Sequence, residues 1–372
     1  MLFYTTSFSI SATASENNHM KPMISVIVPV HNGGPLFDRC LTALQQTLYE
    51  RWECIVVEDG STDNSVEIAY AHGARLVTGL SRRLGPAQAR NIGAQVARGE
   101  ILFFVDADVL VQPGTVGHVA ATMQADPSLA ACFGSYDDQP SAPNFLSQYR
   151  NLLHHYVHQR GKIDASTFWS GCGAIRRDIF LALGGFNEHL YERPSVEDIE
   201  LGYRLQAAGH RVQLEKLLQV KHMKHWTPRQ MLVTDVRDRA LPWTRLILQG
   251  GGAPNDLNLN FSQRLSTAVA FIGLFSLGGT LLSGWAWLSV LLSMLLLIWL
   301  NWPFYQFLLD KRGLRFMLMA LPWHWLYFIY SGATFLVGLV LYRLGRMEQL
   351  MADGLRPLAT PPPVKKPQPN ID

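Results

Sequence analysis

Hydrophobic and polar positions alternate in short blocks over the first part of the chain. Short apolar runs rich in β-branched residues, typical of strands buried on both faces, alternate with stretches of helical spacing. The predicted strands are Ile24–Val30, Glu53–Glu58, Arg75–Thr78, Ile101–Val105 and Leu129–Tyr136, and the helices between them are Pro35–Thr47, Asn64–Ala71 and Pro86–Ala97. This order predicts an α/β fold with a largely parallel sheet and helices on both faces.

Polar clusters follow three of these strands: His31-Asn32-Gly33-Gly34, Asp59-Gly60-Ser61-Thr62-Asp63 and Asp106-Ala107-Asp108. Turn chemistry explains one such cluster easily. Three of them at the carboxyl ends of strands indicate a nucleotide crevice, because open parallel sheets bind ligands at that edge. The two carboxylates at 106 and 108 are oxygen ligands that suit Mg²⁺ or Mn²⁺, which usually enter a site together with a phosphate-bearing substrate.

The C-terminal third of the chain is strongly apolar. No Asp, Glu, Lys or Arg occurs from Leu265 to Leu309, and His324 is the only His among the uncharged residues from Phe316 to Tyr342. Because a bilayer core needs about 20 apolar residues per helix, the first run is long enough for two crossings and the second for one. A tight turn is expected at Ser283-Gly284. We therefore predict a transmembrane region of about three spans over residues 265–342.

Basic residues near these spans predict their orientation. Arg245 and Arg264 precede the first span, and Lys311, Arg312 and Arg315 separate the second from the third. The positive-inside rule then places the large N-terminal region in the cytoplasm of a multi-pass inner-membrane protein. The basic pair Arg343 and Arg346 conflicts with this rule, because three crossings put it outside. A re-entrant hairpin hinged near Pro322 or Ser331-Gly332 is the alternative.

Composition narrows the class of protein further. The chain has 32 Lys and Arg against 29 Asp and Glu, a balance that argues against a nucleic-acid partner. The four cysteines form no C-x-x-C pair, as expected for free thiols in a reducing compartment. Residues 1–23 have the composition of a disordered extension, and 357–372 that of a disordered Pro-rich tail.

The chain resembles a family 2 glycosyltransferase with the GT-A fold. The motifs that carry the resemblance are I-S-V-I-V-P-V-H-N at 24–32, V-V-E-D-G-S-T-D at 56–63, G-P-A-Q-A-R-N-I-G at 85–93, D-A-D at 106–108, G-C-G-A-I-R-R at 171–177, G-G-F-N-E at 184–188 and E-D-I-E-L-G-Y-R-L at 197–205. Their order and spacing hold from residue 24 to about 225. The resemblance implies a GT-A domain over 24–227, a nucleotide-sugar donor, a divalent metal and inversion at the anomeric carbon.

The resemblance also implies roles for residues on the donor side. Pro29, Asn32, Asp59, Arg90 and Asp106 would bind the nucleotide, with Asp59 hydrogen-bonded to the base. Asp108 would bind the metal directly, with Asp106 on the metal or the ribose. His222, or His225 in its place, would supply a third metal ligand or a phosphate contact. The non-functional alternatives are that Asp59 only forms a turn, that Arg90 is a solvated helix residue and that the histidines are structural.

On the acceptor side, Glu197-Asp198 opens a helix predicted over Val196–Ala208. The resemblance assigns Asp198 as general base, and Glu197 is placed beside it in the catalytic pair. An inverting transfer is one displacement, so it needs one carboxylate to take the acceptor proton. Trp169 would stack on a sugar ring, and Gly171 and Gly173 would let the backbone approach the sugar or acceptor. The alternatives are that Trp169 is a buried core residue and that Glu197 only stabilises the helix macrodipole at the N-terminus.

One departure from the family concerns residues 237–243, R-D-R-A-L-P-W, which do not match the Q-x-x-R-W motif of processive synthases. Around them, apolar and Arg residues alternate over 228–250 as in an amphipathic helix on the cytoplasmic leaflet, with a packed surface helix as the alternative.

The predicted function is divalent-metal-dependent transfer of a sugar from a UDP-sugar, or less favourably a GDP- or dTDP-sugar. The acceptor would be lipid-linked or a glycan at the cytoplasmic membrane face, in cell-envelope polysaccharide synthesis. A nucleotidyltransferase is the second enzyme class considered, although the loop after the first strand lacks basic residues. A non-catalytic membrane scaffold with a nucleotide-sugar-binding domain is the third. The expected partners are therefore the donor, the acceptor and membrane lipids.

Overall fold

A computed structural model describes residues 21–79, 83–191, 193–250 and 260–347. Most of the predicted N-terminal extension and all of the Pro-rich tail lie outside these described residues.

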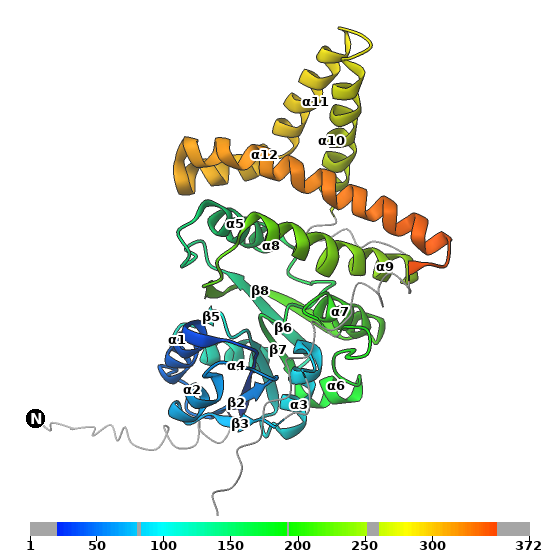
Figure 1. The fold of residues 1–372 in the computed structure, drawn as a ribbon. Helices are drawn as coiled ribbons and strands as arrows, with labels where there is room; N and C mark the ends of the chain where they lie inside the picture. Colours follow the sequence, from blue (N-terminus) through cyan, green and yellow to red (C-terminus); the bar gives the residue numbers. More distant parts are fainter. Residues whose placement is uncertain (1–20, 80–82, 192, 251–259, 348–372) are drawn as a thin grey trace, which may run out of the picture.

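One mixed eight-stranded sheet forms the centre of the N-terminal part, in the order β3-β2-β1-β4-β7-β6-β8-β5. Its strands are β1 Ile24–Val30, β2 Trp52–Glu58, β3 Arg75–Val77, β4 Ile101–Val105, β5 Val109–Leu110, β6 Leu129–Tyr136, β7 Cys172–Arg176 and β8 Arg211–His222. Strands β3, β2, β1 and β4 are parallel, whereas β7 runs antiparallel to both β4 and β6. The predicted α/β fold is confirmed, and its predicted strands are present with boundaries within a residue (Figure 1).

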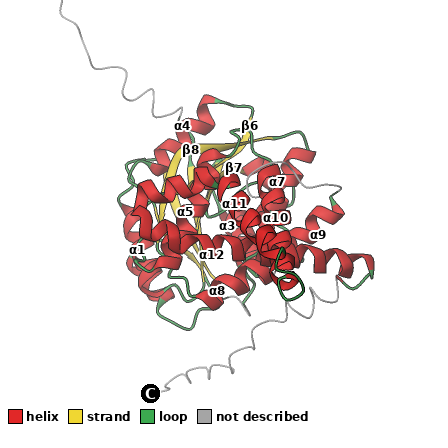
Figure 2. Cartoon of the chain, turned by 90° about the horizontal axis from the view of Figure 1, so that it is seen from above, coloured by secondary structure: helices red, strands yellow, loops and turns green. Residues whose placement is uncertain are grey.

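Helices cover both faces of the sheet, as Figure 2 shows from above. Those of the N-terminal part are α1 Gly34–Gln45, α2 Ser65–Ala71, α3 Pro86–Val96, α4 Thr115–Ala125, α5 Phe145–Arg160, α6 Arg177–Ala182 and α7 Glu197–Ala207. Proline lies in the first turn of α1 and α3, where its missing N–H and its fixed φ favour a helix start. The periodic apolar positions Phe37, Cys40, Leu41 and Leu44 of α1 are all buried, as their spacing predicts.

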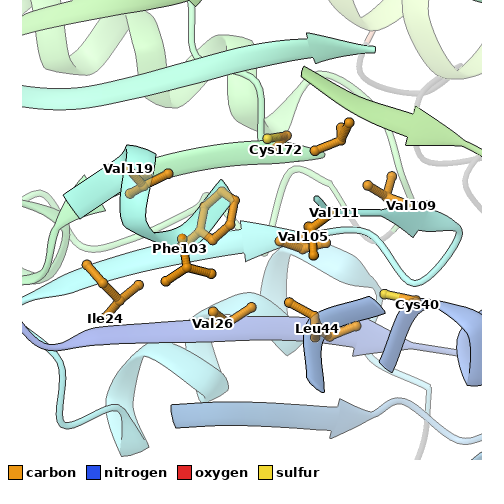
Figure 3. Packing of buried hydrophobic residues seen from close by; sticks show 14 of the residues in the cluster. Ile24, Val26, Cys40, Leu44, Phe103, Val105, Val109, Val111, Val119 and Cys172 are labelled. Atoms are coloured by element: carbon orange, nitrogen blue, oxygen red, sulfur yellow. The ribbon is translucent and has the colours of Figure 1, made fainter. Parts of the chain in front are cut away.

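The hydrophobic core consists of two layers, one on each face of the sheet. In β1, Val26 and Val28 belong to one layer and Ile27 to the other, because successive strand side chains point to opposite faces. Figure 3 shows the first layer, where Val26 and Phe103 of neighbouring strands lie close to Leu44 of α1. Because apolar side chains lie on both faces of the central strands, these strands meet solvent only at their ends.

Strand register then brings the polar clusters together. Val30 pairs with Glu58, and Ile27 with Phe104, so β1, β2 and β4 end at one edge of the sheet. Antiparallel β7 begins at that edge, where Cys172 pairs with Val105. The loops that follow three parallel strands and the loop that precedes β7 therefore meet at one place.

The segment after β8 is helical from Pro228 to Gln249. It consists of α8 Pro228–Val233, the π-helical turns η2 Thr234–Ala240 and α9 Leu241–Gln249. The predicted helix is therefore present, with a π-helical interruption that hydrophobic spacing does not reveal. In Figure 1 this segment runs beside the last helix of the chain, on the side of the sheet domain.

Three helices follow: α10 Phe261–Gly279, α11 Ala286–Leu300 and α12 Trp302–Arg343. Helices α10 and α11 form an upright hairpin whose turn includes Ser283-Gly284, as predicted (Figure 1). Helix α12 is broken at Gly313 (φ 82°) and continues through Pro322 and Ser331-Gly332. The alternative of a re-entrant hairpin hinged at those residues is therefore wrong.

Three membrane-crossing helices were expected in this part of the chain. Within the described residues, only α12 combines the length and the apolar composition of a span, and α11 is apolar but has 15 residues. A multi-pass arrangement with three crossings is not supported by these helices.

Candidate active site

Two loops at the carboxyl edge of the sheet, those after β1 and β2, are joined by hydrogen bonds. Asn32 has a φ of 53° and accepts a bond from the Thr62 backbone N–H through Oδ1 (2.7 Å). Its own N–H donates to Ser61 Oγ (3.0 Å), and the Gly34 N–H donates to Asp63 (2.9 Å). An Asn tolerates this left-handed conformation better than most residues. The predicted nucleotide-site residue Asn32 thus shapes the loops of the crevice.

Asp59, at the end of β2, is buried, with both carboxylate oxygens engaged. Oδ1 accepts from the Leu84 N–H (2.6 Å) and Oδ2 from the Gly85 N–H (2.8 Å), just before α3. Burial raises the pKa of Asp59 above its ordinary value, although the two N–H groups act to lower it. The carboxylate therefore fixes the start of α3, and it retains lone pairs on each oxygen for another donor.

Arg90 of α3 forms a buried bridge between two distant parts of the chain. Its Nη2 donates to Asp106 (2.7 Å) and its Nη1 to Glu197 (2.9 Å). Burial acts to lower the pKa of Arg90, but the two carboxylates outweigh it and raise the pKa, so the guanidinium remains charged. The bridge holds the D-A-D loop next to the start of α7. The alternative of a solvated Arg90 is wrong, since its side chain is only 5% exposed.

Asp198 follows Glu197 at the start of α7 and is partly exposed. Its Oδ2 accepts from the backbone N–H (3.1 Å) and the hydroxyl (3.3 Å) of Ser170, and its Oδ1 from the Ile199 N–H (2.8 Å). Burial and the adjacent Glu197 raise the pKa of Asp198 to about 7. A carboxylate with this pKa is suited to general base catalysis near neutral pH. Glu197 itself is buried between Arg90 and the Ser195 N–H.

Asp108 lies beside His222, which is the last residue of β8. Pairing of β5 with β8 sets Val109 opposite His222, and Asp108 Oδ2 lies 3.6 Å from the His222 Nε2. Burial acts to raise the pKa of Asp108, but His222 and Lys224 outweigh it and lower the pKa. The imidazole stacks on the Tyr136 ring, with centroids 4.1 Å apart.

The carboxylate oxygen of Asp108 suits Mn²⁺ or Mg²⁺, and the imidazole nitrogen of His222 favours a transition metal such as Mn²⁺ over Mg²⁺. Among the described residues no three His, Cys, Asp or Glu side chains gather as a complete metal site. The pair Asp108–His222 therefore fits a cation that takes its other ligands from phosphate and water, as Mg²⁺ commonly does.

Trp169 is partly buried in a cluster of rings that includes Tyr136, the ring on which His222 stacks. Its ring lies 4.8 Å from that of Tyr136 and 4.7 Å from that of His154 between centroids. A Cβ on Gly171 would come within 2.5 Å of the Trp169 ring, and one on Gly173 within 2.3 Å of the Trp169 carbonyl oxygen. The contacts of this tryptophan thus provide a packing reason for both glycines.

The structure therefore gathers the predicted residues at one edge of the sheet, from loops that are far apart in sequence. Pro29 lies in β1, two residues before His31, where the turn that contains Asn32 begins. His225 follows three residues after His222, the last residue of β8. Ser170 and Tyr136 were not predicted. Ser170 is adjacent to the G-C-G motif, which offered a weak signal, whereas the stacking of Tyr136 on His222 has none in the sequence.

Comparison with known proteins agrees with this geometry. Residues 25–184 match the family model described as glycosyl transferase family 2. Validoxylamine A glucosyltransferase of Streptomyces hygroscopicus subsp. jinggangensis is 31% identical over 223 residues, 50% of this chain and 52% of that protein. Glycosyltransferase GlyG of Streptococcus pneumoniae is 33% identical over 130 residues, 34% of this chain and 43% of that protein. The chain thus spans about half the length of these curated relatives.

Among solved structures, the mannosyltransferase PcManGT of Pyrobaculum calidifontis, in complex with GDP-Man and Mn²⁺, is similar in fold. It has a TM-score of 0.56 and 19% identity, and the match covers 85% of this chain and 87% of that one. At this identity the likeness concerns the fold alone. Residues 25–184 thus match the glycosyl transferase family 2 model, and the sheet domain has a GT-A-like fold.

Proposed function

We propose that the chain is an inverting glycosyltransferase that moves a sugar from a nucleotide-sugar, with a UDP-sugar favoured, to a lipid-linked or glycan acceptor at the cytoplasmic face of a membrane. The observation that carries the proposal is the Arg90 bridge. It brings the D-A-D loop, suited to a divalent metal that would bind a diphosphate, next to Asp198, a carboxylate suited to accept a proton. Transfer of a glycosyl group needs these two functions side by side.

On the donor side, Asn32 and Asp59 would hold the nucleoside, with a lone pair of Asp59 directed to the N–H of the base. Asp108 and His222 would hold the divalent metal, with Asp106 kept in place by Arg90. The metal, when bound, would offset negative charge on the departing nucleoside diphosphate. Arg90 and Glu197 are positioning residues in this scheme, because they form an ion pair with each other. Glu197 was predicted as part of the catalytic pair, and we propose this supporting role for it instead.

On the acceptor side, Asp198 takes the proton of the acceptor hydroxyl. The freed oxygen bonds to the anomeric carbon while the bond from that carbon to the diphosphate oxygen breaks, and the electron pair leaves with the nucleoside diphosphate. The Ser170 N–H and hydroxyl orient the Asp198 carboxylate during this step. One displacement inverts the anomeric centre and needs no enzyme nucleophile.

The test uses membranes that contain the protein, a panel of radiolabelled nucleotide-sugars and extraction of lipid-linked product. One sugar should be transferred by the wild type, and Asp198→Asn should lower the rate by about 10³-fold, within the range for loss of a general base. Asp164→Asn is the matched control, because Asp164 has a highly exposed side chain (79%) far from α7 in sequence. Wild-type transfer by Asp198→Asn contradicts the proposal.

Calorimetry of UDP binding with and without Mn²⁺ separates the donor site from the base. We expect Asp108→Ala to lose the metal-dependent part of UDP binding, and Asp198→Asn to retain it. If the wild type binds no UDP with metal present, a non-catalytic scaffold is the better description. Release of pyrophosphate in place of nucleoside diphosphate would identify a nucleotidyltransferase.

A further inference from the structure

Helix α12 contacts the sheet domain and its flanking helices along its whole length. Before the Gly313 break, Lys311 Nζ lies 2.6 Å from the Asp138 carboxylate and Arg312 donates to the Asp138 carbonyl (2.7 Å). In the middle, the Tyr330 hydroxyl donates to Asp235 of η2 (2.6 Å). Near the other end, a Cβ on Gly338 would come within 2.7 Å of the Thr244 side chain of α9.

These contacts exclude a helix that crosses a bilayer while the sheet domain stays in water. From Leu314 to Arg343 the helix rises about 45 Å at 1.5 Å per residue, more than the roughly 30 Å of a hydrocarbon core. If it crossed, one end would lie on the far side of the membrane, beyond reach of Asp138 or of Thr244. Both ends and the middle touch either the sheet domain or the helices η2 and α9 beside it, so the long axis of α12 lies along the surface that they form together.

The hairpin of α10 and α11 rises from the opposite side of α12 (Figure 1). It meets α12 closely, since a Cβ on Gly332 would lie 2.5 Å from the Phe271 ring of α10. Away from this contact the hairpin is covered by exposed apolar side chains, with Leu282 92% and Trp285 83% exposed in its turn. Its two helices, of 19 and 15 residues, extend about 28 and 22 Å. An apolar surface of this size on a monomer marks a partner of apolar chemistry.

We propose that the hairpin α10–α11 is the part of the described chain that enters the lipid bilayer, and that α12 lies in the plane of the membrane surface. The outer face of α12 supports this position, because Leu318, Leu336 and Val340 are exposed there. Ala320 is buried in a cluster with residues of α5, and Phe328 in a cluster with residues of the hairpin. An exposed apolar face on a helix that packs against a water-facing domain is suited to the boundary between headgroups and acyl chains. The helix then serves as a platform between the sheet domain and the hairpin.

With α12 on the membrane surface, the basic pair Arg343 and Arg346 no longer conflicts with the positive-inside rule. With α12 in the plane of the surface, Arg343 and Arg346 at its end lie on the same side of the bilayer as Lys311, Arg312 and Arg315 near its start. All five basic residues then lie on the same side of the bilayer as the sheet domain, in agreement with the positive-inside rule. The choice of partner also follows from composition: no charged residue occurs between Leu265 and Leu309, which suits lipid rather than a second protein with a polar rim.

Labelling of single cysteines in sealed vesicles of known orientation tests the side on which α12 ends. Arg346→Cys should react with a membrane-impermeant maleimide from the same face as Asp164→Cys on the sheet domain. Labelling of Arg346→Cys only from the opposite face would overturn the proposal. The wild type supplies the background, since Cys40, Cys132 and Cys172 are buried and any labelling of the partly exposed Cys54 is measured there.

Spin labels measure depth independently of any activity. Labels at the exposed positions Leu314, Leu318, Leu336 and Val340 of α12 should show one shared, shallow depth in oxygen and nickel accessibility. Labels at Leu288, Leu291, Leu295 and Trp299 of α11 should differ in depth from one another. If α12 crossed, Leu314 and Val340 would be about 39 Å apart along the membrane normal and the middle of the helix would be deepest. That profile, or four equally water-exposed positions on α11, would contradict the proposal, whether or not sugar transfer is detected.

Discussion

Two largely buried arginines of this chain form ion pairs of different geometry. Arg90 divides its guanidinium between Asp106 and Glu197, whereas Arg150 of α5 binds both oxygens of a single carboxylate, Asp235, at 2.5 and 2.7 Å. Arg150 also lies over the Trp226 ring, 4.8 Å from its centroid. One arginine therefore serves two carboxylates at the candidate active site, and the other neutralises one carboxylate at the junction of α5, η2 and α12.

The difference has an electrostatic consequence for the nearest carboxyl groups. Arg90 is shared, so Asp198 beside it is left with burial and Glu197 as dominant influences, and its pKa rises to about 7. At Asp235 burial also acts to raise the pKa, but the undivided Arg150 outweighs it and lowers the pKa. A shared cation leaves a neighbouring carboxyl able to exchange a proton near neutral pH, and an undivided cation removes that ability.

Replacement of each arginine by methionine should separate the two roles most strongly. Arg90→Met and Arg150→Met each leave a buried carboxylate without its cation, and each should lower the free energy of unfolding by about 3–5 kcal/mol. Arg90→Met should also lower kcat/KM by about 100-fold, because the base and the D-A-D loop lose their alignment. Urea denaturation in detergent and transfer assays below the unfolding midpoint measure the two effects. Equal loss of transfer in both variants, at equal fractions folded, would refute the distinction.

The pH dependence should have opposite signs in the two clusters. Asp198 must be deprotonated to act as base, so kcat should fall about tenfold per unit as the pH is lowered below 7. Its raised pKa means that the folded state binds more protons than the unfolded state, so stability declines as pH rises from about 4 to 7. The lowered pKa of Asp235 gives stability that is present above the ordinary value and lost as pH falls through the lowered one.

Urea denaturation of the wild type and of Asp198→Asn at pH 5 and pH 8 checks the signs. The Asn variant lacks the first contribution, so its stability relative to the wild type should be greater at pH 8 than at pH 5. No change in this difference between the two pH values would contradict the raised pKa.

Tyr330→Phe should have a smaller effect, confined to the Arg150 cluster. The variant keeps the ring of α12 but loses the hydrogen bond to Asp235, which should cost about 1–2 kcal/mol because the acceptor is charged. Urea denaturation measures this cost, and UDP binding should be unchanged. Weaker UDP binding in this variant would mean that the contact of α12 with η2 reaches the donor site.

Ser170→Ala should have the smallest effect and change only the pH profile. The hydroxyl donates to Asp198 over 3.3 Å and favours its charged form, while the Ser170 N–H remains in the variant. Loss of the hydroxyl should raise the pKa of the base by about half a unit, and so lower the rate at pH 6 by about threefold. A profile that shifts to lower pH would contradict this arrangement.

The elements that carry the site could be predicted from local sequence, and its contacts could not. The apolar run Ile101–Val105 ends where Asp106 begins, so the position of the D-A-D loop at a strand end follows from hydrophobicity alone. The bond between Arg90 and Glu197 joins residues 107 positions apart, and no pattern within either motif reveals it. Likewise, the antiparallel insertion of β7 between β4 and β6 depends on tertiary pairing rather than on the alternation of strands and helices.

The C-terminal helices show the same limit of prediction from sequence. Hydropathy identified the apolar segments and the turn of the hairpin, but not that α12 lies against the sheet domain. Its length and composition are those of a span, and the contacts of Lys311, Tyr330 and Gly338 become visible only once the helix is placed in space.

The stacking of Tyr136 on His222 gives the imidazole a fixed direction. The two rings are nearly parallel (9°), so one face of the imidazole is covered and rotation about the Cβ–Cγ bond is blocked. A ligand can then meet His222 only at the ring edge, along the lone pair of Nε2, on the side where Asp108 lies. In the metal site proposed above, the pair would therefore discriminate between ions by their preferred bond angles as well as by their charge.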